Sequence, residues 1–430
     1  MLNNELTSSW GRKKKKIISF PFIVVISYFI VEYGRPHDWL PPLRAAHPGI
    51  LIFGLAILTM LVVRPTFNKS FFYILLFFLV MVIGVPFATN RFYAYSTTFG
   101  FATLIFGAIL PIISYVNTYE KLRILIWLWI LIHISLAIYG VLNNGVGVGY
   151  FIQDENDLCL AINIAIPYAI YMFMSVDSRK KKLILIVAII MFLATVVSTL
   201  SRGGFIGLLA IGGMFWLKLP RKMAATIILI ISVLVMWWAT PSSYWEEMQT
   251  IESSTNKDDT GHERLYLWGV AWKMFLDNPI IGVGPSNFPY NNEFYESQEE
   301  KRMGRHIWGK ASHSLYFTLL PELGLIGTFI FFYLVLLGIK ERKTLRNKYQ
   351  EIIQNNNVNE DDKNKLKFIR DMSIAIDIAL VTFLVSGAFL TVLYYPHFWV
   401  LIAFSVITKS NFDKIVEKIT AKDCDPLAAM

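Results

Sequence analysis

The sequence predicts an all-α, polytopic membrane protein with about 12 transmembrane helices. Of its 430 residues, 55% are hydrophobic and only 17% are charged, a balance too apolar for a soluble domain of this length. Apolar runs of about 15–20 residues recur along the chain, and each is long enough as a helix to cross a hydrocarbon core of roughly 30 Å. Because lipid offers the backbone no hydrogen-bond partners, we expect these runs to be helical.

The predicted spans make residues 1–430 a single integral membrane domain. The first span follows the basic stretch GRKKKK and lacks a small-residue cleavage site, so we expect it to stay uncleaved. With only Cys159 and Cys424 available, no structural disulfide and no CxxC redox or metal motif is expected. The predicted spans are residues 17–33, 49–63, 70–88, 97–115, 122–141, 157–176, 183–200, 203–219, 222–240, 313–339, 372–394 and 396–408.

The distribution of positive charge indicates a membrane topology. The net charge is +9, which would suit a nucleic-acid-binding protein. With the N-terminus placed in the cytoplasm, however, the inner segments contain 29 of the 40 Lys and Arg residues, as the positive-inside rule requires. Both termini are therefore predicted to be cytoplasmic, and no nucleic-acid partner is expected.

Two long hydrophilic segments interrupt the spans. Residues 340–371 are predicted to form a cytoplasmic loop, as a solvated helical hairpin or linker. Residues 241–312 are predicted to form a folded extracytoplasmic loop that contains the helix TGHERLYLWGVAWKMFLDNP. Trp268 belongs to an aromatic face of this helix, which either lies in the membrane interface or packs on the outer ends of the spans.

The stretch STLSRGGFIGLLAIGG places Arg202, Gly203 and Gly204 at the predicted outer face. An arginine near a helix end can simply reach the lipid headgroups. Alternatively, its planar fork matches phosphate oxygens, and the two glycines would let a bulky ligand approach the backbone. Arg264, also on the outer side, would add a second fixed charge suited to a lipid-linked diphosphate that departs from a sugar.

His313 opens a predicted span, where its ring can stay in water above the bilayer. A lone histidine is commonly structural, but its position among external arginines makes it a candidate general base. Glu322 is an acid within the same span and a candidate for substrate binding. The alternative is that the Pro321–Glu322 pair and the nearby glycines only shape the helix.

Weaker candidates lie at other outer positions. Arg91 ranks first among the remaining external cations because its loop is short. Asn156 belongs to a polar cluster, residues 154–157, that either caps a helix or touches sugar hydroxyls. The GVGPSN stretch at 282–287 lacks the lysine of a phosphate-binding loop and predicts a tight turn. HExxH and paired-histidine patterns are absent, so neither a metal site nor a cofactor is predicted.

Three stretches, taken in order, resemble the O-antigen ligase and polymerase superfamily. They are SRGG, ERLYLWGVAWKMFLDNPIIGVGPSNF and HSLYFTLLPELGLIG, between residues 198 and 327. The opening EYGRPHDWLPPL, residues 32–43, is also similar to the branch associated with exopolysaccharide and exosortase systems and O-glycosylation. Where the family often has His-Asn, this chain has His313–Ser314, which removes one potential sugar-binding amide.

The resemblance implies a glycosyltransferase-C-like fold and metal-independent transfer at the outer, periplasmic face of the bacterial cytoplasmic (inner) membrane. The donor would be a glycan on undecaprenyl diphosphate, and the acceptor a hydroxyl of lipid A core, a glycan or a protein. Arg202 and Arg264 would hold the diphosphate, and His313 would activate the acceptor. Ligase, polymerase and protein-glycosylating activities remain open.

Two other classes of protein share some of these features. A transporter or flippase would have the same apolar spans, with broken helices and with ionisable residues near the middle of the membrane. Asp377 and His133 are the candidates for that role, and the sequence shows an evident partner for neither. A membrane sensor or scaffold would need no ordered outer arginines.

Overall fold

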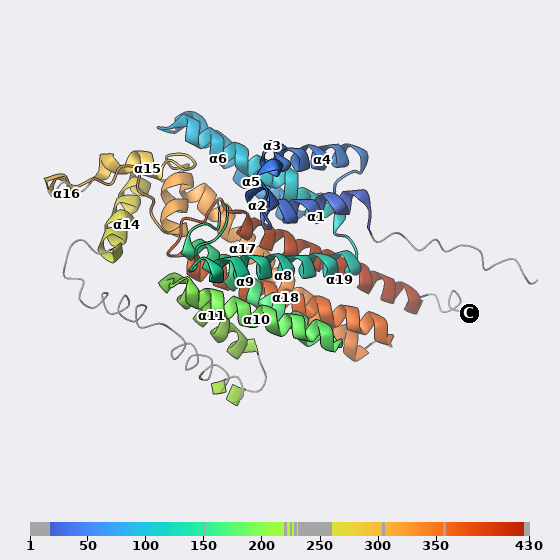
Figure 1. The fold of residues 1–430 in the computed structure, drawn as a ribbon. Coiled ribbons are helices and arrows are strands. Elements are labelled where there is room, and N and C mark those ends of the chain that lie inside the picture. Colours follow the sequence, from blue (N-terminus) through green and yellow to red (C-terminus); the bar gives the residue numbers. More distant parts are fainter. Residues whose placement is uncertain are drawn as a thin grey trace, which may run out of the picture.

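The computed structural model describes residues 18–149, 151–218, 222–223, 226–227, 230, 260–302, 306–355 and 358–424. All elements within these ranges are helical, which confirms the predicted all-α class. Figure 1 shows long helices running side by side, with a group of short helices gathered at one end. In chain order the elements are α1 (Phe20–Glu32), α2 (Pro36–Trp39), α3 (Pro41–Ala45), α4 (Pro48–Val62), α5 (Lys69–Gly84), η1 (Val85–Phe87), α6 (Arg91–Leu104), η2 (Ile105–Ile109), α7 (Leu110–Tyr115), α8 (Tyr119–Leu142), α9 (Glu155–Ser175), α10 (Arg179–Ser198), α11 (Arg202–Lys218), α14 (Thr260–Asp277), α15 (Phe288–Asn291), η3 (Asn292–Tyr295), α16 (Gln298–Arg302), α17 (Leu315–Asn355), α18 (Glu360–Gly387) and α19 (Pro396–Cys424).

Among the described residues, six helical segments are long and apolar enough to cross a membrane. Two further apolar helices, α1 and α4, are shorter. The last two predicted spans lie in α18 and α19, which continue into charged sequence, and most of the predicted span 222–240 lies outside the described residues. The chain is thus a multi-pass membrane protein, and the number of 12 spans stays a prediction. The six segments are Lys69–Phe87, Arg91–Tyr115, Tyr119–Leu142, Glu155–Ser175, Arg179–Ser198 and Leu315–Gln354.

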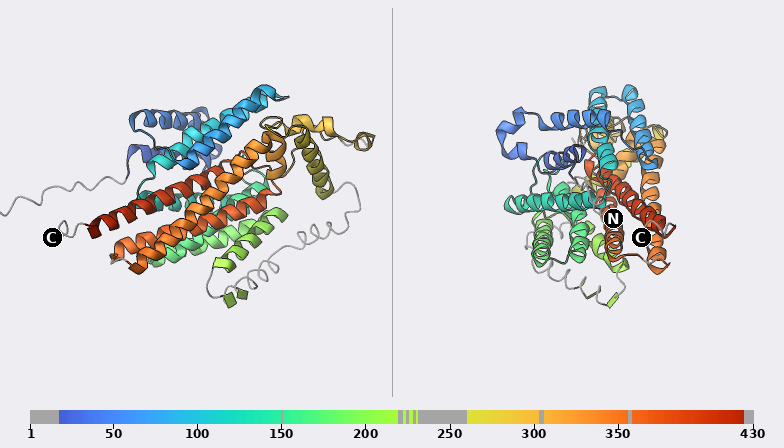
Figure 2. Two further views of the ribbon diagram at one scale, coloured as in Figure 1. Left: turned by 180° about the vertical axis from the view of Figure 1, so that it is seen from behind. Right: turned by 90° about the vertical axis from the view of Figure 1, so that its right-hand side faces the viewer.

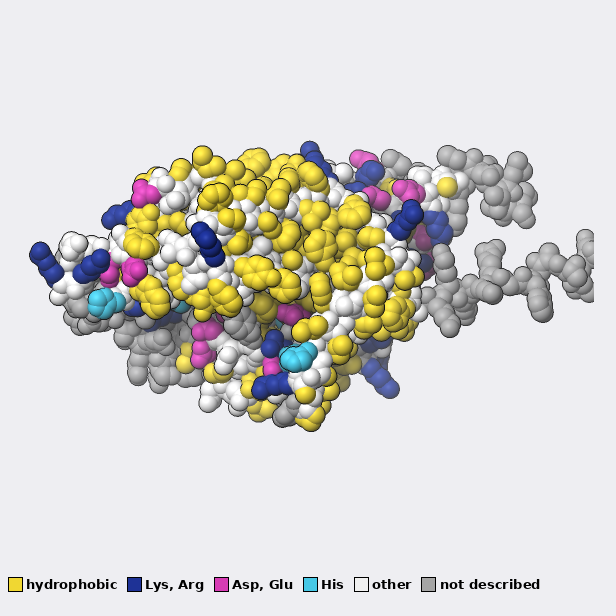
Figure 3. All heavy atoms as spheres, turned by 90° about the horizontal axis from the view of Figure 1, so that it is seen from above, with side chains coloured by type: hydrophobic (Ala, Val, Ile, Leu, Met, Phe, Trp, Pro, Cys, Tyr) yellow, Lys and Arg dark blue, Asp and Glu magenta, His cyan; other side chains and the backbone are white. Residues whose placement is uncertain are grey.

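The surface agrees with a membrane environment. Figure 3 shows a broad hydrophobic face, with charged side chains gathered mainly towards its edges. Many large apolar side chains are exposed on the long helices, including Leu61, Phe99, Ile190 and Phe329. A soluble monomer rarely exposes so continuous an apolar surface, because water would penalise it.

The segments predicted to be cytoplasmic meet at one end of the bundle. The side-chain Nδ2 of Asn411 donates a hydrogen bond to the carbonyl of Val116 at 3.0 Å. The ammonium of Lys418 lies 3.8 Å from a carboxylate oxygen of Asp362. The C-terminal part of α19 therefore lies beside both the α7–α8 turn and the hairpin between α17 and α18, and the start of α1 lies at the same end (Figures 1 and 2).

The segments predicted to be external meet at the opposite end. The backbone N–H of Asn90 donates to the side-chain Oδ1 of Asn287 at 2.7 Å, and the Ser201 hydroxyl donates to Oδ1 of Asn156 at 2.7 Å. The short helices α15 and α16 and the helix α14 also lie at this end (Figure 1). We call this part of the bundle the outer end.

Cysteine labelling should place the two ends on opposite sides of the membrane. Gln298 on α16 and Lys363 on α18 are exposed. Replacing Cys424 by serine leaves Cys159 as the only native thiol of the sequence, and Cys159 is buried. In intact cells, a membrane-impermeant maleimide should label Gln298→Cys but not Lys363→Cys, because the basic segments face the cytoplasm. Equal labelling of both variants, with membrane integrity verified, would contradict the predicted topology.

A buried ion pair lies within the bundle. The side chain of Arg342 donates through Nε to Asp377 at 2.7 Å, and Arg346 lies 2.8 Å from the other oxygen of Asp377. The sequence shows no evident partner for Asp377, and the structure corrects this point by placing two arginines beside it. Because a buried carboxylate held by two guanidinium groups is already neutralised, it offers little to a transported ion.

Helix α17 is broken near its start, and the break holds the segment before α15. Gly324 has φ 59° and ψ −163°, which no helix accommodates. The backbone N–H of Val283 donates to the carbonyl of Pro321 at 2.8 Å, and that of Leu325 donates to the carbonyl of Pro279 at 2.8 Å. Segment 279–284 therefore satisfies the backbone groups that the break leaves free. We call this arrangement the interlock.

Helix α14 packs on protein, which is one of the two arrangements that the sequence leaves open. Its buried residues include Leu267, Val270 and Met274, which pack in one cluster with the segment that follows. Leu265 is 64% exposed and Trp272 is 48% exposed, on a different side of the helix. One face of α14 thus packs on protein, while Leu265 and Trp272 leave an apolar side exposed. A position of this helix in the membrane interface stays a prediction.

Candidate active site

The site begins where α11 starts. Ser201 precedes the helix, and its hydroxyl accepts a hydrogen bond from the backbone N–H of Gly204 at 2.9 Å, as an N-cap does. This places Arg202 in the first turn of α11, at the positive end of the helix dipole. A helix start of this kind favours anionic groups, so the sequence positions both a guanidinium and the positive end of a helix dipole at the outer end.

The start of α9 lies beside it. The carboxylate of Asp154 accepts from the backbone N–H of Asn156 at 2.8 Å and from its side-chain Nδ2 at 2.9 Å. Oδ1 of Asn156 is in turn the acceptor of the Ser201 hydroxyl. Both ends of the Asn156 amide are thus engaged within the protein, so this residue connects the starts of α9 and α11.

Helix α14 brings Arg264 to the same place. Its Glu263 pairs with Lys310 at 2.6 Å, and the indole N–H of Trp268 donates to the carbonyl of Ser312 at 2.9 Å. The Trp268 ring also stacks on Phe317, with centroids 5.1 Å apart. These contacts hold the segment before α17 against α14, and so fix His313 relative to Arg264.

The charges of the three main candidates act on one another. Partial burial lowers the pKa of Arg264, the positive charge of Arg202 lowers it further, and Asp154 opposes both effects. Partial burial also lowers the pKa of His313, and the charge of Arg264 acts in the same direction. Such coupling requires proximity, so the structure brings Arg202, Arg264 and His313 together at the outer end.

His313 is held in a form suited to accept a proton. It has φ 47°, a left-handed conformation that is uncommon for histidine, and its side chain remains exposed. With its pKa lowered from the ordinary 6.5, the imidazole is mainly neutral at pH 7 and can act as a base. Glu263 and Asp154 work against this shift.

The structure changes the interpretation of the two glycines. A Cβ on Gly204 would lie 2.0 Å from the sulfur of Cys159 on α9, so this glycine permits close packing of α11 on α9. The expectation that Gly204 opens the backbone to a ligand is therefore not what the packing shows. At Gly203, by contrast, a Cβ would meet only Phe389 at 3.6 Å, an ordinary contact.

Two other predicted residues do not join the cluster. The carboxylate of Glu322 accepts from the backbone N–H groups of Ser286 (2.7 Å) and Phe288 (3.0 Å) and from the Tyr394 hydroxyl (2.7 Å). It thus anchors the interlock, and its oxygens are occupied by protein donors. Arg91 is exposed at the start of α6, where its neighbour Asn90 contacts the segment before α15 instead of α11 or α14.

Two further residues lie near the cluster. The sequence offers Asp154, within the polar cluster 154–157, as a helix cap or a contact for sugar hydroxyls, and in the structure its charge acts on both Arg264 and His313. Phe389 follows α18 and lies 6.4 Å, ring to ring, from Trp268, beside Gly203. Sequence reasoning missed Phe389, which occurs in no recognisable pattern and is brought to the site by packing between segments far apart in the chain.

Comparisons with known proteins agree with the resemblance noted in the sequence. Residues 186–332 match the family model described as O-antigen ligase, and this region contains Arg202, Arg264 and His313. The chain is also similar to the teichuronic acid biosynthesis protein TuaE of Bacillus subtilis (strain 168). The two are 24% identical over 261 residues, which is 54% of this chain and 53% of that protein, so the match spans about half of each.

These matches confirm the predicted resemblance to the O-antigen ligase and polymerase superfamily. They support a membrane enzyme of the O-antigen ligase or polymerase type, with a role in polysaccharide biosynthesis.

Proposed function

We propose that the protein transfers a glycan from a lipid diphosphate to a hydroxyl group at the outer face of the bacterial cytoplasmic membrane. The donor is a glycan on undecaprenyl diphosphate, and the acceptor is a hydroxyl of lipid A core, a glycan or a protein. One observation carries the proposal: Arg202, Arg264 and His313 are close enough for Arg264 to act electrostatically on His313 and Arg202 on Arg264.

The two arginines suit the leaving group of such a transfer. When the bond between the anomeric carbon and the diphosphate oxygen breaks, the electron pair stays on the diphosphate, and negative charge grows there. The guanidinium groups of Arg202 and Arg264, together with the start of α11, stabilise this charge. A metal ion is not needed for that role, and among the described residues no group of three His, Cys, Asp or Glu side chains could hold one.

His313 serves the other half of the reaction. The acceptor oxygen forms the new bond to the anomeric carbon, and its proton passes to the neutral imidazole. Attack opposite to the leaving diphosphate inverts the anomeric centre. Gly203 and Trp268 border this space and bind the substrates, and Asn156 and Glu322 support the surrounding segments.

Polymerisation by the same site is the second candidate, because it differs only in using a growing glycan as the acceptor. The TuaE similarity favours keeping it, since that relative is named for the biosynthesis of a polysaccharide. A transporter or flippase is the third candidate. It would move the donor without cleaving the anomeric bond, so release of free undecaprenyl diphosphate separates it from both enzymes.

Replacing His313 by alanine should lower glycan transfer about 100-fold or more without weakening donor binding. The reason is that a general base contacts the acceptor proton and not the diphosphate. The purified protein is incubated with an undecaprenyl-diphosphate-linked glycan and a glycan acceptor, and transferred glycan is measured. For the wild type, kcat/KM should fall only below pH 6.5, since the pKa of His313 is lowered from that value and the protonated ring cannot accept a proton.

His306→Ala is the matched control, because His306 is an exposed histidine of the same predicted outer loop. It should retain wild-type transfer, and both variants should unfold at the wild-type temperature. Unchanged transfer by His313→Ala would remove the base from the mechanism. The absence of any transfer or diphosphate release by the wild type would refute the proposed reaction itself.

A further inference from the structure

Three aromatic rings meet on the surface of the outer end. Tyr93 comes from the start of α6, Tyr290 from α15, and Trp308 from the segment between α16 and α17. The rings of Tyr93 and Tyr290 stack with centroids 4.9 Å apart. The ring of Trp308 stands at 75° to that of Tyr290, with centroids 6.2 Å apart. Tyr93 is 46% exposed and Trp308 is 59% exposed. We call these three residues the aromatic corner.

The first ring is fixed by contacts between α6 and the segment before α15. The backbone N–H of Asn90 donates to Oδ1 of Asn287, and Nδ2 of Asn287 donates back to the carbonyl of Asn90 at 3.2 Å. The Thr97 hydroxyl donates to the hydroxyl of Ser286 at 2.8 Å. Because Tyr93 lies four residues before Thr97, both side chains are on the same side of α6. This side of the helix is turned towards protein.

The side of α6 that faces lipid is a different one. Phe92 is 72% exposed and Phe99 is 54% exposed, and their spacing of seven residues places them on one side of the helix. Tyr93 lies about 100° around the helix from Phe92. Tyr290 and Trp308 lie outside the six segments that are long and apolar enough to cross a membrane. The aromatic corner is therefore turned away from the apolar side of α6.

The segment that carries Trp308 also reaches the candidate active site. Nδ2 of Asn292 donates to the carbonyl of Lys310 at 3.0 Å, which holds the turn after Trp308 against η3. The ammonium of Lys310 pairs with Glu263 at the start of α14. His313 follows five residues after Trp308, so their Cα atoms are at most roughly 18 Å apart. The corner and the candidate base thus belong to one short, anchored segment.

Aromatic rings with polar edges suit a sugar. The faces of a sugar ring carry C–H groups with slight positive charge, which are attracted to the negative face of an aromatic ring. The sugar hydroxyls project from its edges, where the hydroxyls of Tyr93 and Tyr290 and the indole N–H of Trp308 can exchange hydrogen bonds with them. Two ring planes that stand nearly at right angles offer one face for stacking and a second wall beside it.

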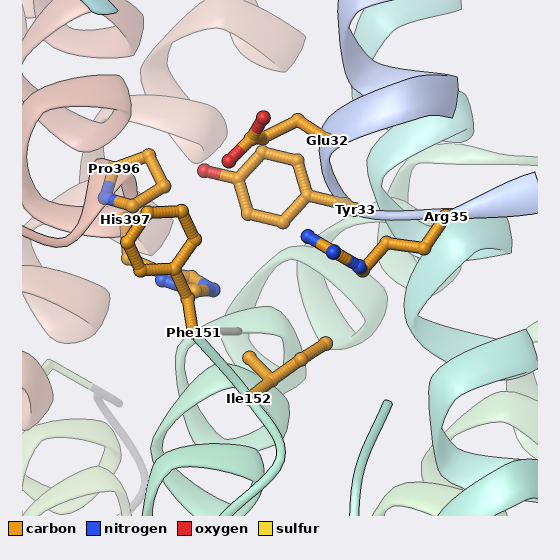
Figure 4. A pocket seen from close by; sticks show the side chains of 7 residues that line it. All are labelled: Glu32, Tyr33, Arg35, Phe151, Ile152, Pro396 and His397. Carbon is orange, nitrogen blue, oxygen red and sulfur yellow. The ribbon is translucent and has the colours of Figure 1, made fainter. Parts of the chain in front are cut away.

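This surface is open, unlike the pocket between the end of α1, the segment before α9 and the start of α19. Figure 4 shows that pocket, which Tyr33, Phe151 and His397 help to line. It leaves room for no more than about one water molecule, so a sugar ring cannot enter it. The exposed rings of the aromatic corner, by contrast, are accessible to a glycan chain that continues in both directions.

We propose that the aromatic corner binds the acceptor glycan at a sugar unit away from the hydroxyl that reacts. This inference rests on the proposed function, in which Arg202 and Arg264 hold the donor diphosphate and His313 receives the acceptor. The segment from Trp308 to His313 then leads from the bound sugar unit to the point of reaction. Among the acceptors that the proposed function leaves open, a glycan chain is the one that this surface fits.

Trp308→Ala should raise the KM for a long acceptor roughly 3- to 10-fold and leave kcat unchanged, because a stacking partner is lost away from the reacting atoms. The long acceptor is the oligosaccharide released from the lipid-linked donor by mild acid, and the short one is its terminal sugar alone. The short acceptor reaches His313 but not the corner, so its KM should stay at the wild-type value. Trp308→Phe keeps a ring and should restore most of the affinity for the long acceptor.

Trp272→Ala is the matched control, since Trp272 is also an exposed tryptophan, 48% exposed on α14, but does not belong to the corner. It should leave the KM of both acceptors and the unfolding temperature unchanged. A normal KM of Trp308→Ala for the long acceptor, or an equal rise for both acceptors, would overturn the inference.

Two further measurements need no transfer. The free oligosaccharide should raise the unfolding temperature of the wild type and of Trp272→Ala, and raise that of Trp308→Ala less. In bilayers that contain brominated lipids, which quench tryptophan on contact, Trp308→Ala and the wild type should lose the same absolute fluorescence. A smaller loss in Trp308→Ala would place the ring in the membrane interface and contradict the assignment to a glycan.

The proposed function can fail separately from this inference. If the corner has no role, Trp308→Ala still releases undecaprenyl diphosphate and transfers glycan to both acceptors as the wild type does. If the proposed function is wrong, the wild type itself releases no undecaprenyl diphosphate. Binding of the oligosaccharide at the corner would then show a sugar site without transfer and would contradict its assignment to an acceptor.

Discussion

Replacing Arg202 or Arg264 by lysine should lower glycan transfer roughly 30- to 1000-fold. Lysine keeps the positive charge but loses the planar fork that donates two hydrogen bonds to one phosphate group. A charge-assisted contact that strengthens as the diphosphate leaves is worth on the order of 2–4 kcal/mol in the transition state. Donor binding should weaken as well, because the diphosphate is already charged before the reaction.

Arg302→Lys is the control, since Arg302 is exposed on α16 in the same predicted outer loop, and it should transfer glycan at the wild-type rate. Transfer and donor affinity are measured for each purified variant, together with its unfolding temperature. Arg202 and Arg264 are only partly buried, so their variants should fold. If both lysine variants transfer normally, the diphosphate lies elsewhere and Arg202 is an anchor to lipid headgroups.

A double variant tests whether the arginines act on one group. Arg202 and Arg264 influence each other electrostatically, so both guanidinium groups are expected to contact the same diphosphate. Their effects should then be non-additive, with the double variant less impaired than the product of the single effects. Strictly multiplicative losses would indicate two separate ligands.

Much of this fold could be predicted because lipid leaves the backbone few choices. Within the described residues, the apolar runs form helices. The segments predicted to be cytoplasmic lie at one end of the bundle, where Asn411 donates a hydrogen bond to the carbonyl of Val116. The number of spans is harder to predict, because a helix can continue beyond its apolar run into charged sequence. α18, for example, combines a charged start with an apolar remainder.

The site residues could be predicted only where a single charged or titratable side chain is conspicuous by its position in the sequence. Arg202, Arg264 and His313 stand out because charge at the membrane edge is costly, and packing does bring them together. Glu322 also stands out as a buried acid, yet it anchors a loop, and sequence cannot distinguish these roles.

The interlock explains why the sequence has two glycine-containing stretches, residues 279–284 and the stretch around Gly324, that meet in the structure. The loop after α14 supplies backbone partners to the break in α17, and Glu322 binds the backbone N–H groups of Ser286 and Phe288. Each stretch therefore depends on the other for the hydrogen bonds of its backbone. Because the interlock joins the segment after α14 to the start of α17, it adds a second connection between these two helices to the Glu263–Lys310 and Trp268–Ser312 contacts.

Gly324→Ala should accordingly prevent stable folding. With φ 59° and ψ −163°, Gly324 occupies a region that only glycine adopts readily. An added Cβ would also lie 2.4 Å from the carbonyl oxygen of Ile280, a backbone atom that cannot easily move. Strain and clash together should cost about 3–5 kcal/mol, a large part of the 5–15 kcal/mol that holds a typical protein folded.

The matched control is Gly269→Ala on α14, where a Cβ would meet nothing within 4 Å. This change should be neutral or slightly stabilising, because alanine is the better helix former. The measurement is the yield of monodisperse protein in detergent and its unfolding temperature, which should both fall for Gly324→Ala alone. Equal stability of the two variants would show that the break in α17 tolerates a side chain. The connection between α14 and α17 would then not depend on the interlock, and the Glu263–Lys310 and Trp268–Ser312 contacts would be enough to hold His313 against α14.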